Sequence, residues 1–293
     1  MEKVVVIGGS GFIGSHTADC LSERGYDVTI FDNIESRWLR SDQEMIIGDI
    51  LDADQLEKVI SGSNYVYHFA GIADIAESKE KPLETIKLNV LGTMNAVQAS
   101  LDTKVKRFVL ASTMYVYSPF GSFYRATKQA SESIIEVFSD ELGLEYSFLR
   151  YGSLYGPRAQ PWNGLRRYVE QVAKNGSLDY RGTGKERREY IHVIDAAKLS
   201  VDILDEKYAN SAITVTGHQA LYSDELIDLI FEISGKEKKV NYIKRDISPD
   251  HYLNTPYRFS PKTAIKLVPD EFYDLGQGVL EVMEEVSKKS NSQ

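Results

Sequence analysis

The sequence KVVVIGGSGFIG at residues 3–14 joins a short apolar run to a turn that contains Gly8, Gly11 and Gly14. The β-branched residues of 3–7 predict a buried strand, and apolar residues three and four apart over 12–24 predict a helix directly after the turn. In such a unit the glycines permit a tight turn, close approach of a pyrophosphate and packing of the helix on the strand. We therefore predict that a dinucleotide binds at this turn, with a plain glycine turn as the simpler alternative.

An acidic residue, Asp32, follows the second predicted strand at 27–31. A carboxylate at this place accepts hydrogen bonds from both ribose hydroxyls and repels a 2'-phosphate. Asp32 thus favours NAD over NADP, although Arg37 weakens that preference and a solvated turn aspartate is the alternative. Asp49 follows the third predicted strand and could meet the adenine amino group, with Ile50 against the ring. A helix N-cap is the alternative role for Asp49.

Short apolar runs and helical segments alternate through the first half of the chain. The further expected strands are 44–47, 64–70, 105–111 and 145–149, and the further expected helices are 52–61, 83–101 and 124–142. Apolar strands separated by helices indicate a parallel sheet that is covered on both faces. The predicted fold class is therefore α/β, with a Rossmann-type doubly wound parallel sheet and a small C-terminal lobe.

After about residue 156 the alternation becomes less regular. The expected elements are helices at 162–174, 195–204, 223–234 and 275–288, and a glycine-rich turn at 182–184. This part is predicted to form a smaller lobe at the C-terminal ends of the strands, where open α/β sheets bind ligands. We expect the dinucleotide-binding domain to comprise 1–160 plus 186–215, and the substrate-binding lobe to comprise 161–185 plus 216–293.

Charge and cysteine content exclude several classes of protein. The net charge of -9 disfavours nucleic-acid and anionic-membrane binding, which needs an excess of Lys and Arg. Cys20 is the single cysteine, so neither an internal disulfide nor a cysteine-based zinc site can form. His68 and His192 are expected to be packed in the core or to lie near the adenine rather than to bind metal. No segment has the ~18 to 20 apolar residues of a membrane span, so we expect a cytoplasmic protein without metal, nucleic-acid or membrane partners.

Tyr124 and Lys128 form a Tyr-x-x-x-Lys pair at the start of the helix predicted at 124–142. A spacing of four places both side chains on one helix face, where the ammonium can lower the pKa of the phenol and hold the nicotinamide ribose. The preceding strand ends at Ala111-Ser112-Thr113, which brings a hydroxyl beside that helix. Hydroxyl, phenol and ammonium together predict a proton-transfer set for an alcohol that is being oxidised.

With these motifs the chain resembles the extended short-chain dehydrogenases/reductases, and within them the nucleotide-sugar epimerases and dehydratases. The resemblance covers most of the chain. It rests on GGSGFIG at 8–14, GDI at 48–50, HFAG at 68–71, KPLETIKLNVLGT at 81–93, STMYVY at 112–117, YRATK at 124–128, RYGSLYGPR at 150–158 and GTGKERREYIHVIDAA at 182–197. Together these motifs are specific for the superfamily and less specific for the reaction.

The resemblance implies roles for individual residues. Thr113, Tyr124 and Lys128 match the catalytic set, with threonine where serine is common. The residues expected to bind NAD are Gly8, Gly11, Phe12, Ile13, Gly14, Asp32, Asn33, Asp49, Ile50, Phe69, Ala70, Gly71, Lys81, Asn89, Tyr124 and Lys128. Those expected to bind a nucleotide-diphosphate sugar are Thr113, Tyr124, Ser153, Asn163, Arg188 and Arg258. Arg188 matches the arginine that pairs with the diphosphate, and a surface arginine is the alternative for both arginines.

Two departures from the family pattern affect the expected reaction. In 4,6-dehydratases the catalytic threonine is followed by an acid, because elimination of water needs a general acid and base. Met114 and Tyr115 fill those places here, so we expect neither dehydration nor the related decarboxylation. Gly152 and Ser153 stand where many relatives carry Phe-Asn, which predicts a different pose of the substrate or a different nucleotide.

The resemblance implies an NAD-dependent nucleotide-sugar 4-epimerase. Tyr124 would take the C4 hydroxyl proton while a hydride leaves C4, and the 4-keto sugar would turn and receive the hydride on its other face. A 4-dehydrogenase or 4-ketoreductase with net NAD(H) turnover is the alternative enzyme, and a non-catalytic NAD-binding sensor is a third hypothesis. A homodimer that packs through the helices at 83–101 and 124–142 is expected by resemblance.

Overall fold

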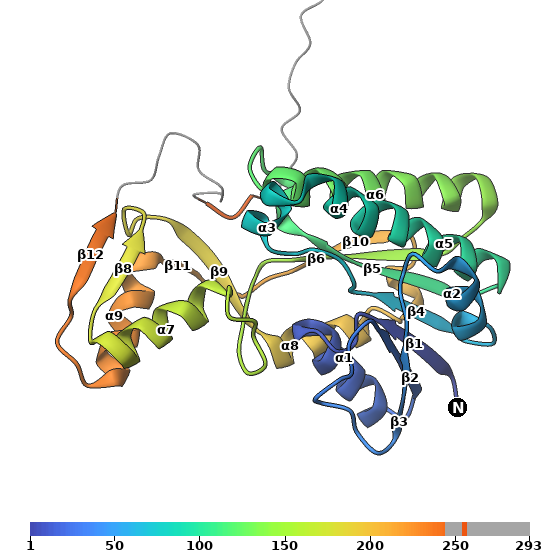
Figure 1. Ribbon diagram of the computed structural model, residues 1–293, viewed down its shortest axis with the longest axis horizontal. Coiled ribbons are helices and arrows are strands. Elements are labelled where there is room, and N and C mark those ends of the chain that lie inside the picture. Colours follow the sequence, from blue (N-terminus) through green and yellow to red (C-terminus); the bar gives the residue numbers. More distant parts are fainter. Residues whose placement is uncertain (244–253, 257–293) are drawn as a thin grey trace, which may run out of the picture. The chain divides into compact units, whose positions relative to one another are not determined.

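Seven parallel strands form the main sheet (Figure 1). Their order is β10 (Ser211–Val215), β6 (Tyr146–Tyr151), β5 (Arg107–Thr113), β4 (Tyr65–His68), β1 (Lys3–Ile7), β2 (Asp27–Asp32) and β3 (Gln43–Ile47). The computed structural model describes residues 1–243 and 254–256, all of which belong to the unit Met1–Ser260. β2 and β3 lie on one side of β1. After β3 the chain crosses to the other side of β1, where β4 begins, so the direction of winding reverses at β1. This confirms the predicted doubly wound α/β sheet, whose ligand crevice is expected at the C-terminal ends of β1 and β4.

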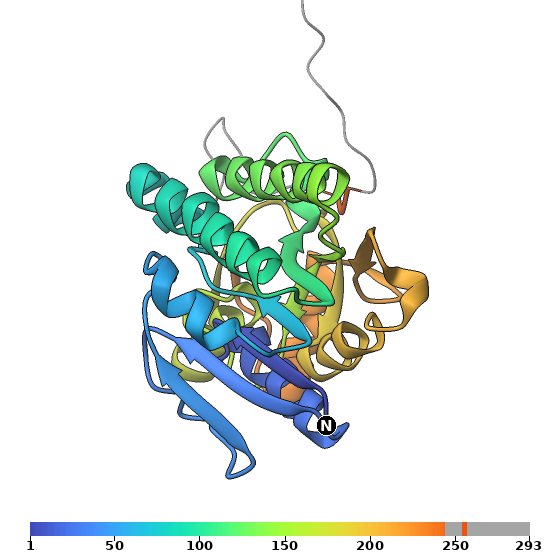
Figure 2. The same cartoon turned by 90° about the vertical axis from the view of Figure 1, so that its right-hand side faces the viewer.

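Helices cover both faces of the main sheet because its strands are apolar on both sides. Val4 and Val6 pack with α1 (Phe12–Glu23) and α8 (Val193–Asp202) on one face. Val5 and Ile7 pack on the other face. The helices of that second face are α2 (Ala53–Ile60), α5 (Gly92–Asp102) and α6 (Ser122–Leu142). Figure 2 shows the teal and green helices, α5 and α6, side by side on that face.

The segment predicted as one helix at 83–101 is divided in the structure. It follows α3 (Ile75–Glu80) and consists of α4 (Pro82–Ile86), the π-helical turn η1 (Lys87–Leu91) and α5. A π-helical turn has one more residue per hydrogen-bonded ring than an α-helix and often occurs at functional sites. Hydrophobic spacing cannot reveal such an insertion, and this one lies at Asn89, a predicted site residue.

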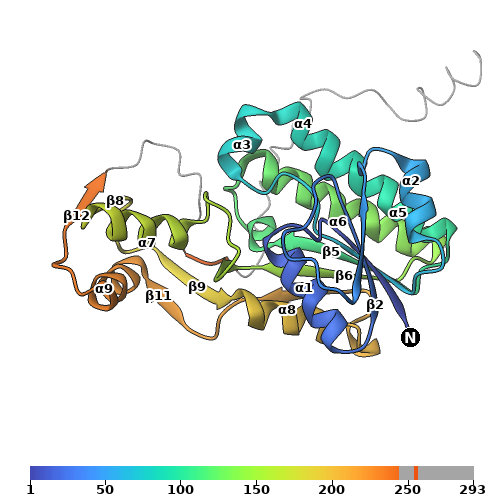
Figure 3. The same cartoon turned by 60° about the horizontal axis from the view of Figure 1, so that its bottom comes forward.

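A smaller group of elements follows β6. It contains a three-stranded sheet of β11 (Ala220–Tyr222), β9 (Arg187–His192) and β7 (Ser153–Tyr155), and a pair of strands, β12 (Val240–Ile243) and β8 (Leu178–Arg181). The helices α7 (Gly164–Asn175) and α9 (Ser223–Ser234) share an apolar core with β8 (Figure 3). The 3-10 turns η2 (Met114–Tyr117) and η3 (Glu206–Tyr208) complete the described elements.

The second half of the chain agrees with the expected elements only in part. The predicted helix 223–234 coincides with α9, whereas the helix expected at 195–204 begins two residues earlier, at Val193. β9 pairs with β7 and β11, while β10 returns to the main sheet. The domain boundaries stay a prediction, and the helix expected at 275–288 lies outside the described residues. Within the described ranges 1–243 and 254–256, no helix is both long and apolar enough to span a bilayer.

Candidate active site

The glycine-rich turn after β1 is packed too tightly for a side chain at Gly8, Gly9 or Gly14. A Cβ at Gly14 would lie 2.3 Å from the carbonyl oxygen of Gly8. Gly8 has a φ of +83°, and a Cβ there would lie 2.4 Å from the amide nitrogen of Ala70. Gly11 is less confined, with its nearest atom at 3.3 Å, and it is the N-cap residue of α1. The turn therefore holds α1 against β1 and the loop after β4.

The N-terminus of α1 fits an anionic group such as a pyrophosphate. Gly11 has no side chain to cap the helix, and the first turn carries no acidic residue. The amides of Phe12 and Ile13 lie in that turn, where helix N-termini bind phosphate. The amide of Ser10 donates to Oδ2 of Asp32 at 3.0 Å, and that of Ile34 donates to Oδ1 at 3.2 Å. A carboxylate held beside the turn fits the ribose of NAD, and Asn33 follows it, exposed.

Asp49 and Ile50 follow the neighbouring edge strand, β3. Oδ1 of Asp49 accepts a hydrogen bond from the amide of Leu51 at 2.9 Å. The N-cap of α2 is Asp52 instead, so the alternative role of Asp49 as a helix cap is wrong. The cap lies three residues later because the chain first makes a turn at Asp49. Ile50 is buried, and its Cδ1 would lie 2.5 Å from a Cβ at Gly92.

Asn89 connects the loop after β4 to α6. Its Oδ1 accepts from the amide of Ile72 at 2.8 Å, and its Nδ2 donates to the carbonyl of Ile72 at 2.9 Å and to Thr127 at 3.1 Å. The carbonyl oxygen of Asn89, within the π-helical turn, accepts from the hydroxyls of Thr93 and Ser131. These contacts fix the loop that contains the predicted cofactor residues Phe69, Ala70 and Gly71. A Cβ at Gly71 would lie 2.5 Å from Oδ1 of Asn89.

Lys81, one of the residues predicted to bind the cofactor, forms an ion pair on the protein surface. It lies between α3 and α4, and its Nζ pairs with Glu77 at 3.0 Å. Half of its side chain is exposed. Its contact with the cofactor stays a prediction.

The predicted proton-transfer residues come together at the C-terminal end of β5. Thr113 is the last residue of that strand and is buried, and Tyr124 and Lys128 lie four residues apart on α6. Nζ of Lys128 donates to the carbonyl of Ala111 at 2.7 Å, which holds α6 against β5. Burial lowers the pKa of Lys128 to about 8, and the nearby carboxylate of Glu132 opposes that shift. The ring of Tyr115 stands edge-on to the ring of Tyr124, with centroids 6.2 Å apart.

A buried ion pair that the sequence did not reveal lies beside this set. The guanidinium of Arg150, on β6, pairs with the carboxylate of Glu132, on α6, at 2.6 Å. Hydrogen bonds and attraction to Glu132 raise the pKa of Arg150 despite its burial. Glu132 follows Lys128 by four residues, and that spacing is the one signal in the sequence that could have indicated its position on the same helix face.

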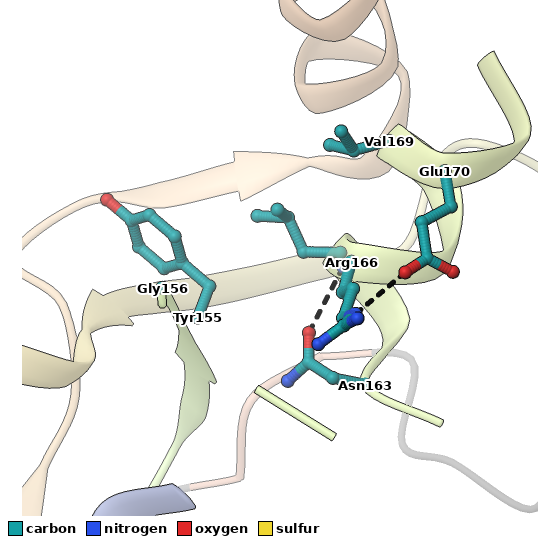
Figure 4. A pocket seen from close by; sticks show the side chains of 7 residues that line it. Tyr155, Gly156, Asn163, Arg166, Val169 and Glu170 are labelled. Carbon is teal, nitrogen blue, oxygen red and sulfur yellow. Dashed lines mark hydrogen bonds and ion pairs between the residues drawn. The ribbon is translucent and has the colours of Figure 1, made fainter. Parts of the chain in front are cut away.

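Figure 4 shows a pocket of about 250 Å³ at the start of α7. Its lining residues are Tyr155, Gly156, Asn163, Leu165, Arg166, Val169 and Glu170. Asn163 is the N-cap of α7, where its Oδ1 accepts from the amide of Arg166 and its Nδ2 donates to the carbonyl of Leu154. Arg166 lines the pocket and pairs with Glu170 at 2.7 Å.

The remaining predicted substrate residues lie on the small three-stranded sheet or beyond the described part. Ser153 begins β7, and its backbone is paired with Tyr190 of β9. Arg188 is also on β9 and is partly buried. A Cβ at Gly152 would lie 2.7 Å from a methyl of Thr216, which gives a packing reason for glycine there. Arg258 lies outside the described residues.

The two histidines considered as metal ligands have structural partners. Nε2 of His68 is 2.9 Å from Oγ1 of Thr93, and Nδ1 of His192 accepts from the amide of Ile194 at the start of α8. Burial, with a smaller effect of Lys128, lowers the pKa of His68 to about 3. Among the residues that the structure describes, no three His, Cys, Asp or Glu side chains are grouped as a metal site.

Known proteins with similar sequences and structures include nucleotide-sugar enzymes. The model of the NAD dependent epimerase/dehydratase family matches residues 4–215. A UDP-N-acetyl-alpha-D-glucosaminuronate decarboxylase from Bacillus cytotoxicus is 29% identical, over 90% of this chain and 91% of that protein. A putative UDP-glucose 4-epimerase from Methanocaldococcus jannaschii is 30% identical, over 78% of this chain and 81% of that protein.

A solved structure supports the same assignment of fold. The UDP-glucuronic acid 4-epimerase from Bacillus cereus, in complex with a fluorinated UDP-glucuronic acid and NAD, superposes with a TM-score of 0.81. It is 26% identical, and the match covers 88% of this chain and 90% of that one. The similarity therefore extends beyond the glycine-rich turn to most of the chain.

Proposed function

The chain belongs to the NAD-dependent epimerase/dehydratase family, and we propose that within it the protein is a nucleotide-sugar 4-epimerase. The observation that carries this proposal is the grouping of Thr113, Tyr124 and Lys128 at the end of β5, with Met114 and Tyr115 where dehydratases have acids. The relative from Methanocaldococcus jannaschii that is named a putative UDP-glucose 4-epimerase, over 78% of this chain, supports the same reaction.

Tyr124 acts as the base toward the C4 hydroxyl of the sugar in this proposal. The ammonium of Lys128, one helical turn away, favours the phenolate because opposite charges attract. Thr113 donates or accepts a hydrogen bond at the same hydroxyl. Bound NAD supplies the redox chemistry, because its nicotinamide can accept a hydride from C4 and give it back. The proton that Tyr124 has taken returns to the C4 oxygen when the sugar presents its other face.

The cofactor is held by residues that surround the glycine-rich turn. The amides of Phe12 and Ile13 bind the pyrophosphate, and Asp32 accepts hydrogen bonds from the adenosine ribose. Asp49 and Ile50 would contact the adenine. Asn89 acts indirectly, since its hydrogen bonds connect the loop after β4 to the helix that carries Tyr124 and Lys128.

The nucleotide-diphosphate part of the substrate is proposed to bind in the pocket at the start of α7. Asn163 and Arg166 line that pocket, and Ser153 and Arg188 lie on the neighbouring three-stranded sheet. Arginine suits a diphosphate because its guanidinium can donate two parallel hydrogen bonds. Anchoring the diphosphate leaves the sugar free to turn about its phosphate linkage, as inversion at C4 requires.

The proposal is tested by incubating the purified protein with UDP-hexoses, UDP-N-acetylhexosamines, UDP-hexuronic acids and GDP-sugars. NMR should show inversion at C4 for at least one of them, with no net change in NAD. The Tyr124→Phe variant is the control and should give no inversion. If wild-type protein inverts none of these sugars, the proposed function is wrong.

A decarboxylase is the second candidate, because a relative over 90% of the chain carries that name. Oxidation at C4 of a UDP-hexuronic acid places a ketone next to the carbon that bears the carboxylate, so CO2 can leave without the acids that elimination of water requires. Met114 and Tyr115 therefore weigh against dehydration more than against decarboxylation, contrary to the expectation from the sequence. Release of CO2 from a UDP-hexuronic acid would favour this candidate. Net formation of NADH with a released ketone would instead favour the 4-dehydrogenase or 4-ketoreductase alternative.

We also propose a homodimer that forms through α4, α5 and α6. Leu83 of α4 is 79% exposed and Val137 of α6 is 58% exposed, so both helices present apolar side chains to solvent. Burial of such side chains in a partner would stabilise the pair. Light scattering on the purified protein tests this, and a Leu83→Glu/Val137→Glu variant should be monomeric.

A further inference from the structure

The buried Glu132/Arg150 pair is bonded in a way that leaves little freedom to either side chain. Nε and Nη2 of Arg150 donate to the two carboxylate oxygens of Glu132 at 3.0 and 2.6 Å. The hydroxyl of Ser112 donates to Oε1 of Glu132, and Nη1 of Arg150 donates to the hydroxyl of Tyr117. The side chains of Glu132 and Arg150 are 8% and 16% exposed. The four residues therefore form one connected polar cluster inside the protein.

This cluster joins the elements that carry the proposed catalytic residues. Glu132 is on α6, one turn after Lys128, and Ser112 precedes Thr113 on β5. Arg150 is on β6 in register with Ser112, and Tyr117 ends the turn η2 that follows Thr113. Tyr124, Lys128 and Glu132 succeed one another at intervals of four residues, so they share a face of the helix.

We propose that the Glu132/Arg150 pair is a positioning device for the proton-transfer set: it fixes Thr113 relative to Tyr124 and Lys128 and balances the charge behind them. Its catalytic consequence rests on the proposed function. The effect of the pair on the charges of Tyr124 and Lys128 does not rest on the proposed function, because that effect follows from distance and burial alone.

Stability by itself does not account for such a pair. Replacing a buried ion pair by well-packed apolar residues is often neutral or stabilising, because two charges must be removed from water. Here the carboxylate of Glu132 is in direct contact with the guanidinium of Arg150, and Lys128, whose charge it also favours, lies one helical turn away. The negative charge of Glu132 stabilises the buried ammonium of Lys128, which the surrounding apolar core would otherwise disfavour.

The groups that face Tyr124 and Lys128 come from several elements. Burial lowers the pKa of His68 of β4 to about 3, so this side chain is neutral at pH 7, and Tyr115 and Tyr117 of η2 are phenols. Glu132 and Arg150 are thus the charged side chains identified next to Lys128 among the described residues. Removal of the carboxylate should make the region more positive, and removal of the guanidinium should make it more negative.

The test compares Glu132→Gln, Arg150→Met and the double variant. Tyrosine labelled with ¹³C at Cζ reports the titration of Tyr124 by NMR, and the signal is assigned from Tyr124→Phe. In Glu132→Gln we expect Tyr124 to titrate at a pH lower by about one unit, and in Arg150→Met at a pH higher by about one unit. The double variant, which lacks both charges and can fold where a single variant does not, should titrate near the wild type.

The matched control is Glu145→Gln, which breaks the ion pair with Arg107 at the opposite end of β5. It should leave the titration of Tyr124 unchanged. If the two single variants shift the titration in the same direction, or if the control shifts it equally, the proposed charge balance is overturned.

Turnover tests the positioning part of the proposal. With any nucleotide sugar that the wild type converts, the double variant should lose about tenfold or more in kcat while KM changes little, because the two hydrogen bonds by which Arg150 of β6 holds the side chain at position 132 of α6 are lost. Wild-type kcat in the double variant would refute positioning. If the wild type converts no sugar, the proposed function fails, and the NMR titrations still decide the charge balance.

Discussion

Replacement of Lys128 by methionine should abolish turnover without destabilising the protein at pH 7. Lys128 is buried, and burial lowers its pKa from 10.5 to about 8. At about 1.4 kcal/mol per pKa unit, the charged side chain costs the folded state roughly 3 kcal/mol. Methionine removes that cost and has a similar length, so it should fill the same space.

The gain is reduced by the hydrogen bond that Lys128 makes. Nζ donates to the carbonyl of Ala111 at 2.7 Å, and a buried carbonyl that loses its donor costs about 1–3 kcal/mol. The expected net change in the free energy of unfolding at pH 7 is therefore between about 0 and +2 kcal/mol. Loss of activity without loss of stability would identify Lys128 as a residue retained for chemistry.

The pH dependence of the free energy of unfolding tests the pKa of Lys128 more directly than the value at one pH does. Folded Lys128 loses its proton above about pH 8, whereas an unfolded lysine keeps it up to about pH 10.5, so the unfolded state binds more protons in this window. The free energy of unfolding of the wild type should therefore rise relative to Lys128→Met, by about 1.4 kcal/mol per pH unit. Urea unfolding of both proteins, freed of nucleotide, between pH 7 and about 10 measures the difference.

The control for this experiment is Lys106→Met, which removes a lysine that is 57% exposed and pairs with Glu2. The difference in the free energy of unfolding between Lys106→Met and the wild type should change little over the same pH range. A difference between wild type and Lys128→Met that stays constant from pH 7 to about 10 would refute the argument, because it would mean that Lys128 keeps its ordinary pKa in the folded protein.

Three further substitutions test separate parts of the site. Tyr124→Phe should retain bound NAD and lose at least about 10³-fold in turnover, measured by NMR of the sugar, because no phenolate remains to take the C4 proton; residual turnover near the wild type would remove Tyr124 from the mechanism. Gly14→Ala places a Cβ 2.3 Å from the carbonyl of Gly8, so α1 must shift, and calorimetry should show NAD affinity reduced by at least about tenfold with stability lowered by about 1–3 kcal/mol. Asp32→Asn should weaken NAD binding by about 10- to 100-fold and reduce the preference over NADP, because a charged acceptor for the ribose is lost; equal affinities for NAD in both proteins would contradict this role.

Local sequence was enough to predict the features that depend on neighbouring residues. The strand, turn and helix at 3–24 follow from apolar spacing and glycines, and the structure has β1 and α1 there. The Tyr124 and Lys128 pair lies on one face of α6 as its spacing requires. The π-helical turn at Asn89 and the cap at Asp52 were missed, because each depends on hydrogen bonds that apolar spacing does not encode.

The sequence by itself determined the alternation of strands and helices that gives an α/β fold, the family, and NAD as its cofactor, since each follows from short runs or motifs along the chain. The tertiary structure alone decided which distant side chains meet. Arg150 reaches Glu132 because β5 and β6 are adjacent in the sheet and α6 packs over them. The packing of α6 against β5 likewise buries Lys128, whose Nζ donates to the carbonyl of Ala111, and this burial lowers its pKa. Strand order and helix packing, which sum over many weak contacts along the whole chain, place these groups together, and no short motif specifies them.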